Sequence, residues 1–276
     1  MVRRPTISWW TCWLALVGLG FATACLAAEF HPFDGPKPTA VFIQSNPWAS
    51  VIGADTPRVA VYESGEVIFR KQIDGRGFYF HLTLDKQALD TLQEHVKPVL
   101  AIKDLKRSYN VAPNVTDQPE AIFYFRSGDR EVTSTVYGLK ADDTRLPAYT
   151  VLPGDAKPDV PPVELLKLHA WLCKLDYADS KPWLPKYIEV MFSEYSYAPD
   201  ASIVWPKDWP GLDSERAIKR GDSYSIFVDG NMIQKVNEFL ATRKERGAVE
   251  IGGKKMSASW RYTFPSEPVW RKALAQ

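Results

Sequence analysis

The stretch FHLTLDKQALDTLQEHV, residues 80–96, determines how we interpret the rest of the chain. Its first five residues alternate large apolar side chains with His and Thr, which is the period of a strand with one buried face. Asp85 follows, and then Leu89, Leu92 and Val96 recur at the spacing of one helix face. The stretch therefore predicts a strand, a capping aspartate and a helix in immediate succession.

The same pattern recurs 144 positions later, without a gap, in YSIFVDGNMIQKVNEFL, residues 224–240. Asp229 takes the place of Asp85, and Glu238 takes the place of Glu94. Each aspartate precedes an expected helix, where a carboxylate can accept hydrogen bonds from the first backbone N–H groups. We therefore expect two copies of a strand–cap–helix unit, each followed by a β-hairpin.

The residues around both copies predict antiparallel sheets. Ser64-Gly65 and Gly252-Gly253 separate runs rich in apolar and aromatic residues, as in β-hairpins. In the last run, Met256–Phe264, apolar and polar residues alternate, so one face is expected to be buried and the other wet. The predicted fold class is α+β: two similar units, each a small antiparallel sheet with a helix packed on one face.

Composition divides the chain into four parts. Residues 1–28 form a leader, residues 29–160 the first α+β unit, residues 161–185 a helix and linker, and residues 186–276 the second unit. Prolines are concentrated between residues 140 and 162, which is typical of a connector.

The leader has the features of an export signal. Arg3 and Arg4 provide a positive start, and residues 7–26 form an apolar run without charge. Three outcomes stay open, in this order: cleavage after the leader, lipidation of Cys25 as in a bacterial lipoprotein, and an uncleaved anchor. The expected location is outside the cytoplasm, either periplasmic or anchored to the envelope membrane.

Charge and composition exclude some classes of partner. The chain is 45% hydrophobic, which is enough for a packed core, and its net charge is +1, or −1 without the leader. A nearly neutral chain lacks the basic surface that nucleic acid requires. Membrane contact is expected only through the leader or a lipid on Cys25, and the expected partner is an envelope protein or a cell-wall fragment.

The sequence contains no complete catalytic motif, and we predict no cofactor and no metal site. Gly221-Asp222-Ser223 has the local pattern of a serine hydrolase turn, but no histidine follows His169 to serve as its base. His169 and Cys173 are four residues apart on an expected helix and share a face. They could ligate a metal or form a nucleophile and its base, but we favour simple packing in the core.

An aromatic segment supplies the candidate binding residues. Trp205 and Trp209 belong to the loop WPKDWP, residues 205–210, and Tyr195 and Tyr197 precede it. Exposed Trp and Tyr rings form flat platforms for sugars or peptides and are enriched at binding hot spots. The alternative, which we favour, is that the Trp-Pro pairs close the open end of a sheet.

Several short segments resemble a family of exported bacterial proteins and lipoproteins of unassigned function. They are RVAVYESGEVI at 58–68, TDQP at 116–119, VYGL at 136–139 and the loop at 205–210. The resemblance implies export and brings no catalytic residue with it. The predicted function is therefore a non-catalytic binding or interaction module of the envelope. The alternatives are an envelope hydrolase that uses scattered carboxylates and an accessory subunit that pairs through edge strands.

Overall fold

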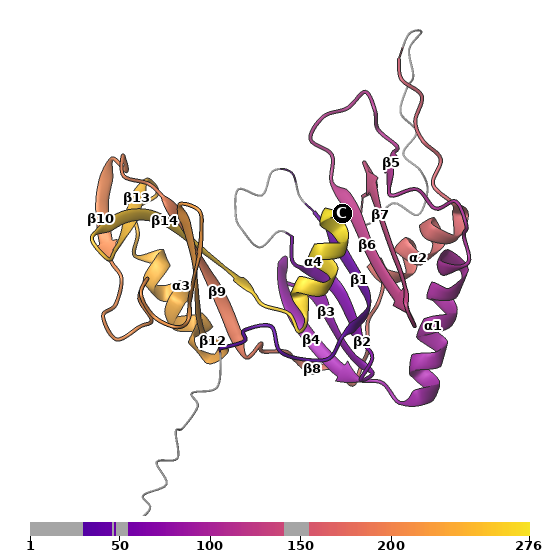
Figure 1. Ribbon diagram of the computed structural model, residues 1–276, viewed down its shortest axis with the longest axis horizontal. Helices are drawn as coiled ribbons and strands as arrows, with labels where there is room; N and C mark the ends of the chain where they lie inside the picture. The colour runs from indigo at the N-terminus through magenta and orange to yellow at the C-terminus, as the bar shows by residue number, and fades with distance from the viewer. Residues whose placement is uncertain (1–29, 46, 48–54, 141–154) are drawn as a thin grey trace, which may run out of the picture. The chain divides into compact units, whose positions relative to one another are not determined.

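Two β-sheets and four α-helices make up the described part of the chain, residues 30–45, 47, 55–140 and 155–276 of a computed structural model (Figure 1). The mixed α and β class predicted from the sequence is confirmed. The sheets have eight and six strands, so they are larger than the small sheets expected. Residues from His31 onward form one compact unit that contains both sheets.

The eight-stranded sheet has the order β5-β7-β6-β1-β2-β3-β4-β8. Neighbouring strands in this sheet are antiparallel, except for the parallel pair β5–β7. The strands are β1 (Pro38–Gln44), β2 (Pro57–Tyr62), β3 (Glu66–Ile73), β4 (Arg76–Thr83), β5 (Ser108–Asn110), β6 (Glu120–Ser127), β7 (Arg130–Tyr137) and β8 (Lys181–Pro182).

The six-stranded sheet has the order β10-β13-β14-β9-β12-β11. It too is antiparallel apart from one pair, β10–β13. The strands are β9 (Tyr187–Glu194), β10 (Asp200–Val204), β11 (Ala217–Arg220), β12 (Ser223–Asp229), β13 (Gly247–Ile251) and β14 (Lys254–Tyr262).

Helices cover both faces of the eight-stranded sheet, whereas the sequence predicted a helix on one face only. Ala40 and Phe42 of β1 face a core that includes residues of α1 (Lys86–Leu100) and α2 (Val163–Cys173). The alternate residues Val41 and Ile43 face the opposite core, which contains the C-terminal helix α4 (Glu267–Ala275). A strand buried on both faces has a continuous apolar run, and β1 has one.

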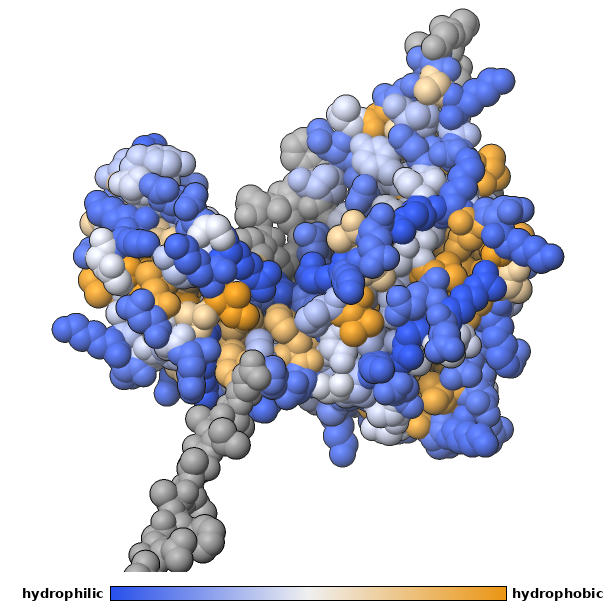
Figure 2. All heavy atoms as spheres, viewed as in Figure 1, coloured by the Kyte–Doolittle hydropathy of each residue, from blue (hydrophilic) through white to orange (hydrophobic). Residues whose placement is uncertain are grey.

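The six-stranded sheet carries the remaining helix, α3 (Ile233–Ala241), which follows a short 3-10 turn, η1 (Gly230–Met232). Val236 of α3 is buried against Val190, Ile226 and Val249 of three different strands. The viewed surface in Figure 2 is mainly hydrophilic, with hydrophobic residues in scattered patches. Most apolar side chains of both sheets therefore lie in the interior.

The two copies of the repeat differ in detail. Asp85 caps α1 as predicted, because its Oδ1 accepts a hydrogen bond from the Ala88 N–H at 2.8 Å. Asp229 makes no such bond; its Oδ1 instead accepts from Arg216 at 2.9 Å, so the prediction of a second capping aspartate is wrong. The hairpins that follow also join their sheets in different ways. In the hairpin β6–β7 the first strand, β6, pairs with the rest of its sheet through β1. In the hairpin β13–β14 the second strand, β14, does so through β9.

Substituting the two aspartates is expected to show this difference. Asp85→Ala removes a helix cap and is expected to lower the free energy of unfolding by about 1 kcal/mol. Asp229→Ala breaks only a partly exposed ion pair and is expected to cost no more than a few tenths of a kcal/mol. Urea denaturation of both variants measures the difference, and equal losses would contradict it.

A buried ion network joins α4 to strands β9 and β14. Arg261 donates hydrogen bonds to Glu189 and, at 2.5 Å, to Glu267. The exposed fractions of the three side chains are only 7%, 0% and 1% respectively. Arg271 of α4 also pairs with Glu267, and Arg220 lies 3.3 Å from Glu189 Oε1. The network fixes the start of the C-terminal helix, and its three central groups, Arg261, Glu189 and Glu267, are almost fully buried.

None of the described helices is long and apolar enough to cross a membrane. The leader and Cys25 lie outside the described residues, so cleavage, lipidation and anchoring stay predictions.

Candidate functional site

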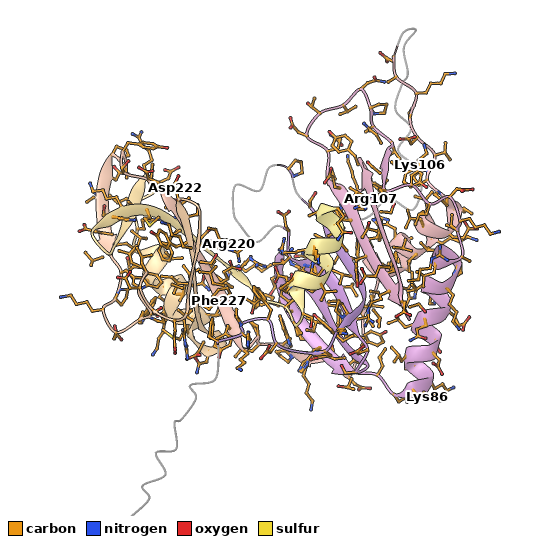
Figure 3. All side chains as sticks on the ribbon, in the orientation of Figure 1. Lys86, Lys106, Arg107, Arg220, Asp222 and Phe227 are labelled. Carbon is orange, nitrogen blue, oxygen red and sulfur yellow. The ribbon has the colours of Figure 1, made fainter. Side chains whose placement is uncertain are left out.

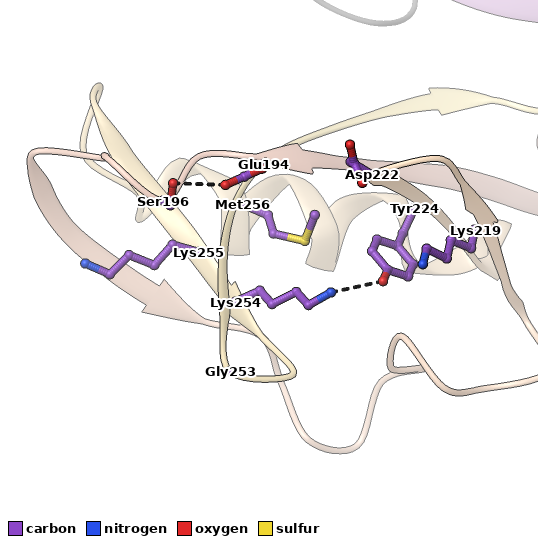
Figure 4. Close-up of a pocket in the computed structure, with 9 residues that line it drawn as sticks. All are labelled: Glu194, Ser196, Lys219, Asp222, Tyr224, Gly253, Lys254, Lys255 and Met256. Carbon is purple, nitrogen blue, oxygen red and sulfur yellow. Dashed lines mark hydrogen bonds between the residues drawn. The ribbon is translucent and has the colours of Figure 1, made fainter.

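A cavity of about 490 Å³ lies at one end of the six-stranded sheet (Figure 4). Its charged wall consists of three basic and two acidic side chains, Lys219, Lys254, Lys255, Glu194 and Asp222. Tyr224 and Met256 contribute aromatic and apolar surface. We call this cavity the lysine–tyrosine pocket.

The register of the sheet brings these residues together. Lys219 of β11 pairs with Tyr224 of β12, and Glu194 of β9 pairs with Met256 of β14. Residues directly opposite each other on antiparallel strands point to the same face. Both pairs lie on the face that α3 covers further along the sheet, because Phe192, two residues before Glu194, belongs to that core. The pocket is therefore the uncovered continuation of the core face.

The charges of the pocket are not paired with one another. Within the described part of the chain, none of the five charged groups lies within 4 Å of an opposite charge. Instead, Lys254 Nζ donates to the Tyr224 hydroxyl at 3.1 Å, and the Ser196 hydroxyl donates to Glu194 at 3.1 Å (Figure 4). Both ammonium and carboxylate groups are therefore free to pair with a ligand.

The hydrogen bond between Lys254 and Tyr224 also affects ionisation. It raises the pKa of Lys254 above its usual value of 10.5, so the amine stays protonated at neutral pH. Lys254 Nζ also lies 5.1 Å from the centroid of the Tyr224 ring, within the range of a cation–π contact. The tyrosine thus positions a permanently charged ammonium group at the pocket wall.

The four aromatic candidates separate into two pairs. Trp205 is only 5% exposed and packs edge-to-face on Phe192, at 5.1 Å, and on Trp209, at 5.0 Å. Its Nε1–H donates to the Pro210 carbonyl at 3.0 Å, so the indole satisfies its own polar group inside the fold. Trp205 is therefore a core residue rather than a displayed platform, and Trp209 packs against the same core.

Tyr195 and Tyr197 lie differently. Their rings are 5.0 Å apart and nearly perpendicular, and Tyr197 is 80% exposed. Ser196 between them lines the lysine–tyrosine pocket. These two tyrosines are adjacent in sequence to the pocket wall, and a binding role for them stays a prediction.

His169 and Cys173 do meet on helix α2, with Cys173 Sγ 3.5 Å from His169 Nε2. The imidazole is fully buried and lies edge-on to the rings of Phe42 and Phe123. Burial, with a smaller contribution from the positive charge of Arg58, lowers the pKa of His169 from 6.5 to about 4. The ring is therefore neutral at pH 7 and packs as a core residue. No group of three or more His, Cys, Asp and Glu residues within the described ranges could hold a metal ion.

The pKa of His169 predicts acid sensitivity. Folding favours the neutral imidazole, so its contribution to stability is complete above pH 6.5 and is lost as pH falls from 6.5 towards 4. The loss is expected to reach about 3 kcal/mol at the acid end. Urea denaturation across this pH range, with His169→Gln as the comparison, measures it. If the two proteins lose stability in parallel, His169 is not the group responsible.

Sequence reasoning missed the basic residues of the pocket. Lys219, Lys254 and Lys255 belong to no motif, and Lys219 is far in the sequence from the adjacent pair Lys254 and Lys255. Tyr224 is the residue through which the sequence could have pointed to this region, because it begins the second copy of the repeat.

Comparison with known proteins yields no relative: no protein-family model, no curated protein and no solved structure matches the chain. The resemblance to exported bacterial proteins therefore stays a prediction from the sequence.

Proposed function

We propose that the protein is an exported bacterial envelope protein that acts as a non-catalytic binding module, with the lysine–tyrosine pocket as its ligand site. The observation that carries the proposal is the set of mutually unpaired charges around this pocket. These charged side chains are exposed and are not held by one another, so a ligand that carries both signs could pair with them through charge-assisted hydrogen bonds. The export part of the proposal is supported by the leader sequence.

The ligand class follows from the wall of the pocket. The ammonium groups of Lys219 and Lys254 favour a carboxylate, and Glu194 and Asp222 favour an amine or a hydroxyl donor. A small polar ligand with free carboxylate and amine groups combines these features. Peptide-bearing cell-wall fragments have this chemistry, and they are the ligand we propose.

We also propose a finer division of the protein into two related α+β units, residues 29–160 and 186–276, joined by residues 161–185, with α2 and α4 packing on the eight-stranded sheet from outside the first range. The support is the strand–helix segment present in both, β4–α1 and β12–α3. Expressing residues 186–276 alone and recording one-dimensional proton NMR spectra tests the division. Dispersed methyl signals support it, whereas a spectrum of an unfolded chain contradicts it.

Removing the charged group at the centre of the pocket is expected to abolish most of the affinity. Lys254→Ala is expected to weaken binding of a soluble cell-wall peptide fragment by roughly 10- to 100-fold, because a hydrogen bond to a charged group contributes about 1.5–3 kcal/mol. Tyr224→Phe, which removes only the hydroxyl that positions Lys254, is expected to have a smaller effect. Isothermal titration calorimetry measures both affinities.

The matched control is Lys235→Ala, which removes an exposed lysine from α3 outside the pocket. It is expected to bind like the wild type. Equal affinities of the wild type and Lys254→Ala would place the ligand elsewhere, and the absence of binding by any fragment would refute the proposed ligand class.

One observation favours a second candidate, an envelope hydrolase. Glu194 and Asp222 line the same pocket, and a pair of carboxylates is sufficient for glycoside hydrolysis. Incubation with polymeric cell wall, followed by chromatography of released fragments, distinguishes the candidates. Release by the wild type but not by Glu194→Gln supports the hydrolase, and binding without release supports the binding module.

A further inference from the structure

A second cavity, of about 450 Å³, lies where strands β1, β2 and β3 approach the C-terminal end of helix α2. Four basic side chains line it, Arg58, Arg70, Lys71 and Lys174, together with a single carboxylate, that of Asp176. We call it the arginine pocket. Its described wall is therefore far more positive than that of the lysine–tyrosine pocket.

Most of this positive charge is not neutralised by the protein. Asp176 pairs with Lys71 at 2.5 Å and leaves the other three basic groups unmatched. Among the described residues, no carboxylate lies within 4 Å of Arg58, Arg70 or Lys174. A cavity lined by one sign of charge focuses the electric field and concentrates ions of the opposite sign.

The backbone places the two arginines next to each other. Val59 of β2 pairs with Phe69 of β3, so the same register places Arg58 opposite Arg70. Like charges at neighbouring positions on adjacent strands repel and destabilise a sheet. Gly77 of β4 makes room for one of them, because a Cβ there would lie 1.9 Å from Arg70 Nε.

We propose that the arginine pocket binds a compact organic acid. Guanidinium groups bind carboxylate oxygens in pairs, and they remain charged at every physiological pH.

Cys173 lines the same cavity and provides a built-in reporter. Iodoacetate and iodoacetamide both alkylate a thiol: the sulfur bonds to the carbon that bears iodine, iodide leaves, and the thiol proton passes to the buffer. Only iodoacetate is an anion, so a positive pocket accelerates it selectively. Mass spectrometry of the peptide that contains Cys173 follows the reaction in the full chain.

We expect the ratio of the iodoacetate rate to the iodoacetamide rate at Cys173 to be on the order of tenfold higher in the folded protein than in the same chain in urea. Arg70→Gln is expected to lower this ratio, and it makes no direct change to α2. Lys86→Gln, at the exposed start of α1, is the charge-matched control and is expected to leave the ratio unchanged (Figure 3). Equal ratios in the folded and unfolded chains would overturn the proposal.

Protection experiments test the ligand class. Citrate is expected to slow alkylation of Cys173, because its carboxylates compete with iodoacetate for the basic side chains of the pocket. Sodium chloride at matched ionic strength controls for screening. If sodium chloride protects as well as citrate, there is no specific site.

Discussion

Replacing Arg261 with Met is expected to lower the free energy of unfolding by about 3–5 kcal/mol, because it leaves two buried glutamates with only the partly exposed Arg220 and Arg271 as counter-charges. Glu189 and Glu267 are both almost fully buried, and Arg261 binds both of them. Water cannot reach these carboxylates to replace the lost interaction. Urea denaturation followed by tryptophan fluorescence measures the change.

Two further variants test the explanation for Arg261→Met. Lys97→Met removes a cation from an exposed ion pair with Glu94 and is expected to change stability by no more than about 0.5 kcal/mol. The triple variant Glu189→Leu, Arg261→Met, Glu267→Leu removes every member of the core network and is expected to recover most of the loss. If the triple variant is as unstable as Arg261→Met, the loss comes from packing rather than from unpaired charge.

Truncating Trp270 is the second change with a large expected effect. Trp270→Ala is expected to lower the free energy of unfolding by about 3–5 kcal/mol, the usual cost of removing a large buried aromatic side chain. Trp270 is fully buried in the core that β1, β2 and β3 share with α4. Hydrogen exchange of the β1 amides, measured together with urea denaturation, is expected to show faster opening of the eight-stranded sheet.

The indole of Trp270 offers a second comparison. Its buried Nε1–H has no hydrogen-bond partner among the described residues. Trp270→Phe removes this unsatisfied donor while retaining most of the ring, so we expect a much smaller loss than for alanine. Lys272→Ala, on the exposed side of α4, is the control and is expected to be close to neutral. A loss from Lys272→Ala as large as that from Trp270→Ala would indicate that helix propensity, not burial, decides the result.

Strand alternation and turn residues correctly predicted the hairpins at Ser64-Gly65 and Gly252-Gly253, because these signals are local. The hairpin turn at Ser64-Gly65 forms as expected, with Gly65 at a φ of 84°, a conformation that glycine adopts without strain. Asp85 caps its helix because the bond spans three residues only. At Asp229 the local pattern was the same, but Arg216, in the turn before the neighbouring strand β11, competes for the carboxylate.

Helix α4 shows where sequence reasoning failed. The segment that ends the chain has no long periodic pattern, and its helix is held by distant partners. Ser266, at its start, donates to the Gly35 carbonyl from 231 positions away, and Trp270 reaches the second face of the eight-stranded sheet. Burial of β1 on both faces therefore depends on residues at the opposite end of the chain.

The sequence by itself determined the mixed α and β class, the alternating strands, the first helix cap and the apolar helix faces, because each rests on interactions within a few residues. Tertiary structure decided which side chains share a cavity. It buried Trp205, paired Glu194 with Met256, and brought Arg58 beside Arg70. Sheet register and packing set these contacts between residues far apart in the chain, and no local pattern encodes that register.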